Sequence, residues 1–126
     1  MDAVEKVVAR FLTGESLEGD LVLFDPFAQK LTLRTGSEER EVDCTVLKAI
    51  FFLRRPNTAP YPDSFLKPAG KKVCVVFADG EAITGYSYGL RPREEGFYLF
   101  PVNQQDRNER IYVIRKNAIR IQTESK

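Results

Sequence analysis

The chain has 126 residues, a formal net charge of +1 and a hydrophobic fraction of 43%, which is typical of a small globular protein and not of a disordered one. The near-neutral charge gives no general attraction to nucleic acid, and no stretch approaches the roughly 18 apolar residues of a membrane span. Histidine, the side chain best suited to proton transfer near neutral pH, is absent, as are a Walker loop and a nucleophile elbow.

These absences predict a protein that binds and does not catalyse, with no cofactor and no metal, and with no membrane as partner. The start of the sequence, M-D-A-V-E-K, lacks the basic and apolar regions of a signal peptide, so we expect a cytoplasmic protein. The two cysteines, Cys44 and Cys74, lie in apolar strand-like runs. In a reducing compartment this placement predicts two buried free thiols and no disulfide.

Two stretches of the chain have nearly the same sequence. Residues 11–19 read F-L-T-G-E-S-L-E-G and residues 77–85 read F-A-D-G-E-A-I-T-G, so an offset of 66 residues relates them. After residue 33 an offset of 69 pairs apolar residues of the two halves, for example Val42 with Ile111. The pattern indicates an internal duplication. We call residues 1–53 copy one and residues 71–126 copy two.

Copy one reads as five short strands. Alternating apolar and polar residues predict strands at residues 7–12, 16–24, 30–34, 40–46 and 49–53. Gly19 lies inside the second strand, where a residue without Cβ permits a sharp bend or the close approach of another backbone. The fourth strand is expected to place Val42, Cys44 and Val46 on one face. The fifth is apolar on both faces, so something other than water must cover its outer side.

Residues 54–70 hold four of the seven prolines, which predicts an extended, semi-rigid linker. Copy two then repeats the pattern, with strands predicted at residues 73–78, 81–88, 97–100, 110–115 and 118–121. Between the first two of these, Asp79-Gly80 predicts a two-residue type I′ turn, in which both central residues have positive φ. The strand at 73–78 is again apolar on both faces.

The repeated pattern resembles the Sm-like proteins. Residues 8–33, with G-E-S-L-E-G-D and F-D-P-F, are similar to the first Sm motif, and residues 113–119, V-I-R-K-N-A-I, are similar to the second motif of the bacterial member Hfq. The resemblance implies an all-β fold of two tandem five-stranded Sm-like barrels, joined by the Pro-rich linker. Residues 73–121, with V-V-F-A-D-G-E, G-F-Y-L-F-P and N-E-R-I-Y-V, are also similar to an uncharacterised bacterial domain that accompanies signalling and regulatory proteins. Each copy resembles this domain.

The Hfq resemblance implies a candidate RNA site. Hfq-like rings stack uridine bases on an aromatic residue near the F-D turn and hold them with polar residues. The corresponding positions are Phe24, Asp25, Phe27 and Gln29 in copy one and Lys116 and Asn117 in copy two. Neither copy has a complete pocket, but copies that alternate around a ring would form one composite site. The alternative is that Phe24 is a core residue and Lys116 a solvated turn residue.

The strands that are apolar on both faces point instead to protein contacts. The candidate interface residues are Ile50, Phe51, Phe52, Cys74 and Val76. They predict either packing of the two copies on each other or contact with another chain, and barrel edges offer a second route to a protein partner or to self-association. Four arginines on two predicted loops of copy two form a candidate basic patch: Arg91, Arg93, Arg107 and Arg110. Scattered solvated charge is the alternative.

From the sequence we therefore expect a non-catalytic binding module, a protein-interaction or regulatory adaptor in bacterial signalling. The alternative is an RNA-binding regulator of the Hfq kind that uses the composite site.

Overall fold

A computed structural model describes residues 5–54, 71–87, 95–101 and 107–123. These residues form ten antiparallel strands and two short 3₁₀ turns, which confirms the all-β prediction. The strands of copy one are β1 (Lys6–Phe11), β2 (Ser16–Asp25), β3 (Lys30–Thr35), β4 (Glu38–Asp43) and β5 (Leu47–Leu53). Those of copy two are β6 (Lys71–Phe77), β7 (Ala82–Ser87), β8 (Gly96–Pro101), β9 (Asn108–Ile114) and β10 (Ala118–Thr123). The turn η1 (Cys44–Val46) precedes β5, and η2 (Arg115–Asn117) precedes β10.

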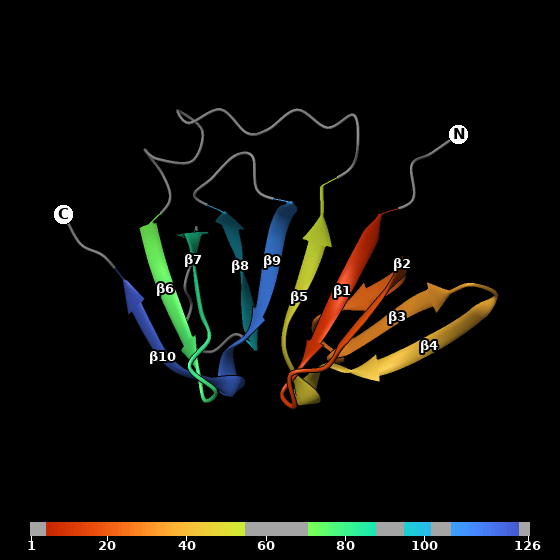
Figure 1. Cartoon of the computed structure of the whole chain (residues 1–126), viewed down its shortest axis with the longest axis horizontal. Coiled ribbons are helices and arrows are strands. Elements are labelled where there is room, and N and C mark those ends of the chain that lie inside the picture. Colours follow the sequence, from red (N-terminus) through yellow and green to blue (C-terminus); the bar gives the residue numbers. More distant parts are fainter. Residues whose placement is uncertain (1–4, 55–70, 88–94, 102–106, 124–126) are drawn as a thin grey trace.

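The strands form one open sheet in the order β10-β6-β7-β8-β9-β5-β1-β2-β3-β4. Each copy contributes five neighbouring strands in the same internal order, with its last strand beside its first. The two copies meet where β9 lies beside β5, in the middle of Figure 1. A division into two closed barrels is not seen, because β5 pairs with a strand of the other copy. Of the predicted linker at residues 54–70, only Arg54 lies within the described residues.

The first turn of each copy has the same structure. Gly14 and Gly80 both have positive φ, +96° and +91°, and each turn is closed by paired backbone hydrogen bonds of 2.8–2.9 Å. The type I′ prediction is wrong, because Asp79 does not adopt positive φ. The Asp79 carboxylate instead accepts a hydrogen bond from the N–H of Glu81 at 3.0 Å. The turn therefore has three residues and ends in a glycine with left-handed backbone conformation, in place of the predicted two-residue turn.

The glycines inside the second strands lie where a neighbouring backbone approaches closely. A Cβ on Gly19 would lie 2.7 Å from the carbonyl oxygen of Arg34, and a Cβ on Gly85 would lie 2.7 Å from that of Phe100. Arg34 and Phe100 are themselves related by the offset of 66. Both copies therefore need glycine for the same reason, as the sequence pattern predicted for Gly19.

Beyond the third strand the structural offset is 71 and not 69. Leu31 pairs with Val42 and Phe97 pairs with Val113, so Val42 corresponds to Val113, and η1 corresponds to η2 at the same offset. The extra residues of copy two fall between β8 and β9. The predicted fourth strand of copy one is also too long. It ends at Asp43, whose carboxylate caps η1 by accepting from the N–H of Thr45 at 2.9 Å.

Two hydrophobic cores share the strands at the junction. Alternate residues of β5 point into different cores: Ile50 and Phe52 into that of copy one, Ala49 and Phe51 into that of copy two. The same alternation holds in β9, where Tyr112 and Ile114 join the core of copy one and Ile111 and Val113 that of copy two. Copy two thus covers the outer face of β5. Burial of each large aliphatic or phenylalanine side chain among them stabilises the shared body by roughly 1.5–3 kcal/mol.

Candidate functional site

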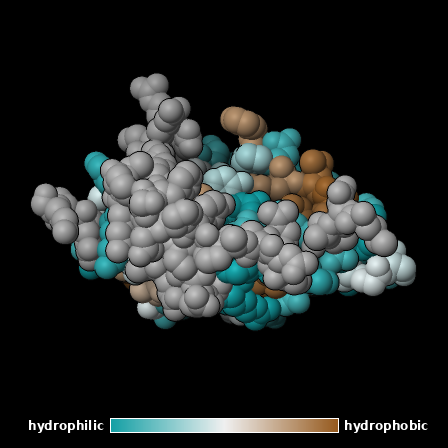
Figure 2. Space-filling model, turned by 90° about the horizontal axis from the view of Figure 1, so that it is seen from above, coloured by the Kyte–Doolittle hydropathy of each residue, from teal (hydrophilic) through white to brown (hydrophobic). Residues whose placement is uncertain are grey.

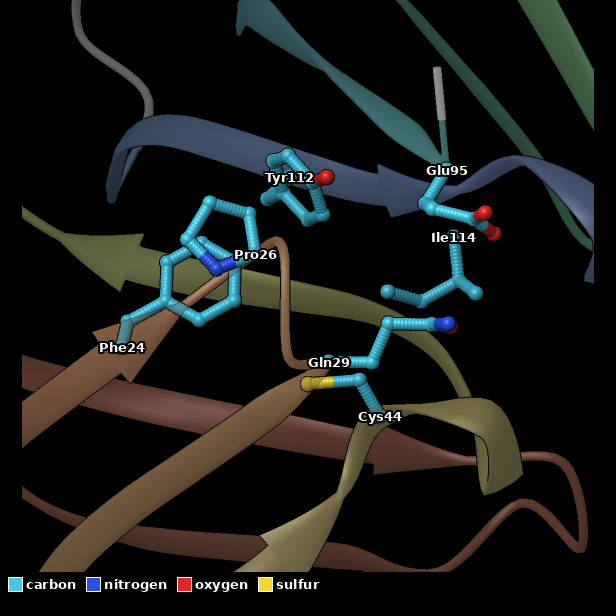
Figure 3. Close-up of a pocket in the computed structure, with 7 residues that line it drawn as sticks. All are labelled: Phe24, Pro26, Gln29, Cys44, Glu95, Tyr112 and Ile114. Carbon is cyan, nitrogen blue, oxygen red and sulfur yellow. The ribbon is translucent and has the colours of Figure 1, made fainter. Parts of the chain in front are cut away.

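The junction between the copies carries a small hollow, drawn in Figure 3. Its lining comes from both copies: Phe24, Pro26, Gln29 and Cys44 from copy one, and Glu95, Tyr112 and Ile114 from copy two. The β2–β3 turn supplies Pro26 and Gln29, and Gln29 adopts a positive φ of 57° to leave the turn. Aromatic and aliphatic side chains dominate the lining, so the hollow offers mainly apolar contacts.

The copy-one residues of the predicted RNA site lie in different environments. The ring of Phe24 meets that of Tyr112 edge-on, with centroids 4.9 Å apart, and so belongs to the junction packing. Asp25 caps its own turn, because its carboxylate accepts hydrogen bonds from the N–H groups of Phe27 and Ala28 at 3.0 and 3.1 Å. The side chain of Phe27 is 95% exposed. Only Phe24 and Gln29 of this set reach the hollow.

The copy-two residues of that site do not line the hollow. The amide of Asn117 donates to the carbonyl oxygens of Leu47 and Thr45 at 2.7 and 3.0 Å, so it fastens η2 to the start of β5. Lys116 is exposed on η2. The charged residue of copy two that lines the hollow is a carboxylate, that of Glu95. The junction thus brings side chains of both copies into one hollow, but not Lys116 and Asn117.

An ionic cluster that the sequence analysis missed also fastens the copies. Lys48 is only 3% exposed, and its ammonium donates to the carboxylates of Asp79 and, at 3.1 Å, of Glu81. Arg10 also pairs with Glu81, at 2.7 Å. Hydrogen bonding to Asp79 raises the pKa of Lys48, and the same bond lowers the pKa of Asp79. A lysine inside an otherwise apolar strand was the available signal, because a buried ammonium needs carboxylate partners.

The predicted basic patch does not gather among the described residues. Arg110 pairs with Glu5 at 2.8 Å, and its guanidinium lies 4.1 Å above the ring of Phe52. Arg107 pairs with Glu18 of the other copy at 3.3 Å, with both side chains largely exposed. Arg91 and Arg93 lie outside the described residues. The two arginines that the structure describes therefore contact copy one.

The candidate interface residues divide into two groups. Ile50, Phe51 and Phe52 are buried at the junction, whereas Cys74 and Val76 are half-buried on the outer face of β6. Both cysteines are free thiols, and burial raises the pKa of Cys44 to about 11. In the part of the chain that the structure describes, no three His, Cys, Asp or Glu side chains are grouped to hold a metal ion. No helix there has the length and apolarity to cross a membrane.

No curated protein and no solved structure matches this chain. The model of one family, described as a family of unknown function (DUF6982), matches residues 3–125, a range that includes all ten strands of both copies. The chain therefore belongs to the DUF6982 family.

Proposed function

We propose that the chain is a non-catalytic, cytoplasmic protein-interaction module that serves as a regulatory adaptor in bacterial signalling. We further propose that its two copies are tandem Sm-like units held as one body by the β9–β5 contact. Support for the non-catalytic part comes from the sequence, which offers no histidine for proton transfer near neutral pH. The ionic and amide groups at the junction are engaged in fastening the copies, which leaves the outer surface for binding.

One exposed apolar site carries the proposal. Val22, Leu23 and Phe27, at the end of β2 and in the following turn, are 42%, 61% and 95% exposed. We call these three residues the β2–β3 tip. Figure 2 shows hydrophobic surface among hydrophilic atoms on the side of the molecule that holds copy one. A phenylalanine that is almost entirely in water gains nothing from the fold, whereas covering its ring with a partner's apolar surface would favour binding.

The test is site-specific photo-crosslinking in cells, with a photoreactive phenylalanine analogue at Phe27. We expect one discrete protein adduct in cells, and this adduct should be lost when the chain also carries Leu23→Asp. The same adduct should form in vitro when the purified partner is mixed with the purified chain that carries the analogue and keeps Leu23. The same analogue at Thr84, an exposed position on β7 and away from the sheet edges, is the control and should give no such adduct. Failure to form a Leu23-dependent adduct at Phe27 would refute the proposal.

RNA binding is the second candidate, because Phe24 and Gln29 do meet residues of copy two in one hollow. It ranks lower, since Glu95 lines that hollow and a carboxylate repels phosphate. The absorbance and RNA binding of the purified protein distinguish RNA binding from the proposed protein interaction. The chain has no Trp, so bound RNA would be conspicuous at 260 nm. Binding of oligo-uridine that is lost in Phe24→Ala and kept in Leu23→Asp would favour RNA.

A further inference from the structure

Two strand edges of the described sheet have no neighbouring strand: β4 at one end and β10 at the other. β4 is the counterpart of β9, and β10 is the counterpart of β5, the two strands that join the copies. We propose that β4 of one chain pairs with β10 of a second copy of this chain, in the arrangement that β9 and β5 take within the chain. This contact goes beyond the proposed function and uses a different surface.

The backbone of β10 presents the same edge as that of β5. Both strands follow a 3₁₀ turn, η2 and η1. Both also pair with the first strand of their copy through a bulge that skips one residue, Ile119 in β10 and Lys48 in β5. Since β5 accepts β9 along its outer edge, from Ala49 opposite Val113 to Leu53 opposite Asn108, β10 offers an equivalent unpaired ladder to an incoming strand.

Exposed hydrophobic residues lie where the internal junction has polar contacts. Ile119 is 66% exposed and corresponds to Lys48, which binds the first turn of copy two. Val46 is 45% exposed and corresponds to Asn117, which binds the start of β5. Leu12, also 45% exposed, lies beside Val46, since its N–H donates to the Val46 carbonyl oxygen at 3.0 Å. The proposed contact would place Leu12 and Val46 of one chain near Ile119 of the next.

Charged residues lie where the internal junction is apolar. At the internal junction, Tyr112 and Ile114 line the hollow together with Cys44. At the offset of 71, Glu41 and Asp43 of β4 correspond to Tyr112 and Ile114, and Arg115 corresponds to Cys44. An acidic pair on β4 would then face a basic residue beside β10. Over the whole elements, β4 has four acids and one arginine, net −3, whereas η2 and β10 together have three basic residues and no acid, net +3.

The exposed apolar residues beside β4 match an apolar residue on β10, and the acidic charge of β4 matches the basic charge of η2 and β10. This complementarity favours a head-to-tail contact over a symmetric one. Two β4 edges would bring together like charges, and so would two β10 edges. A head-to-tail contact uses two different edges, so each added chain leaves one edge of each kind open until a ring closes. The occupant that the two edges fit is therefore a second copy of this chain.

The first test is the mass of the full chain in solution, by native mass spectrometry and sedimentation at about 100 µM and low salt, where surface charge attraction is strongest. We expect species of two or more chains that dissociate as salt is raised. Ile119→Asp should weaken association roughly a hundredfold or more, because it sets a carboxylate against apolar residues and an acidic strand. Leu23→Asp, a similarly exposed position away from both edges, should leave the mass unchanged and lower only partner crosslinking.

The second test mixes two variants. Val46→Asp disables the β4 end of the contact and Ile119→Asp disables the β10 end, so each alone should be monomeric. Their equimolar mixture should give a heterodimer that stops at two chains, because one intact edge of each kind remains. A monomeric wild type at about 100 µM, an unchanged mass for Ile119→Asp, or a mixture that stays monomeric would overturn the proposal.

Discussion

Phe51 belongs to copy one by sequence but fills the core of copy two. Its side chain is 7% exposed and packs with residues of β6, β8 and β9, including Val75 and Leu99, and the guanidinium of Arg10 lies 5.0 Å above its ring. Phe51→Ala should lower the free energy of unfolding by about 3 kcal/mol, the lower part of the range for a buried phenylalanine, since the site lies at the edge of the core. The total stability of a domain of this size is about 10 kcal/mol.

In a thermal scan the same loss corresponds to a fall in Tm of roughly 11 °C, from an unfolding entropy of about 2.1 cal/mol/K per residue. The assay is urea denaturation followed by far-UV circular dichroism, with amide chemical shifts to locate the change. Phe52→Ala is the matched control, because this neighbour is 1% exposed and packs in the core of copy one. Phe51→Ala should shift amides of β6 and β8, and Phe52→Ala those of β1 and β3 together with those of Tyr98 and Arg110, whose side chains lie against the Phe52 ring. Shifts confined to copy one for both variants, or a loss below about 1 kcal/mol for Phe51→Ala, would refute the shared-core reasoning.

Three further outcomes follow from single sites. Gly85→Ala should lower the free energy of unfolding by about 2 kcal/mol in urea denaturation, since its Cβ would lie 2.7 Å from the carbonyl oxygen of Phe100; an effect below about 0.5 kcal/mol would contradict this contact. Hydrogen bonding to a buried lysine lowers the pKa of Asp79, so its contribution to stability is present above the unfolded pKa near 3.8 and is lost as pH falls through the lower folded pKa. The stability difference between wild type and Asp79→Asn, measured by urea denaturation from pH 6 to pH 2.5, should therefore shrink only below about pH 4; a difference that does not change with pH would count against the ion pair. At pH 8, iodoacetamide should modify half-buried Cys74 well before Cys44, whose pKa burial raises to about 11; peptide mass mapping that finds the reverse order would place Cys44 at the surface.

The local structure of each copy was predictable from the sequence because it depends on residues with narrow backbone or steric requirements. Gly14 and Gly80 mark turns that need positive φ, and Gly19 marks a close backbone approach. The apolar run of β5 correctly indicated that its outer face is covered. Such signals are short in range and survive in a duplicated segment even when other residues change.

The partner of β5 was not predictable from that pattern. A strand with two apolar faces needs other side chains packed against both faces. This requirement does not say which strand forms hydrogen bonds along its free edge. The informative contrast is between β9, with four successive apolar residues from Ile111 to Ile114, and β4, which is mostly charged. Only the strand with apolar residues on both faces can serve two cores. The sequence alignment at offset 69 concealed this contrast, because it set β9 against the wrong residues of copy one.

The ligand hypotheses depended on residues whose side chains serve the fold. Asn117 has the polar amide that a base-binding site needs, but that amide is bonded to the carbonyl oxygen of Leu47. Arg110 was assigned to a basic patch, yet it pairs with Glu5 and stacks on Phe52. A sequence does not distinguish a polar group that waits for a ligand from one that satisfies a neighbouring element.

Native-state hydrogen exchange of the full chain tests the central claim most directly, namely that two copies share their junction strands and form one cooperative body. The slowest amides of β1 in copy one and β6 in copy two should report the same opening free energy, equal to the global value from urea denaturation. If one copy opened at a free energy about 2 kcal/mol or more below the other, the copies would be independent domains and the shared cores would be contradicted.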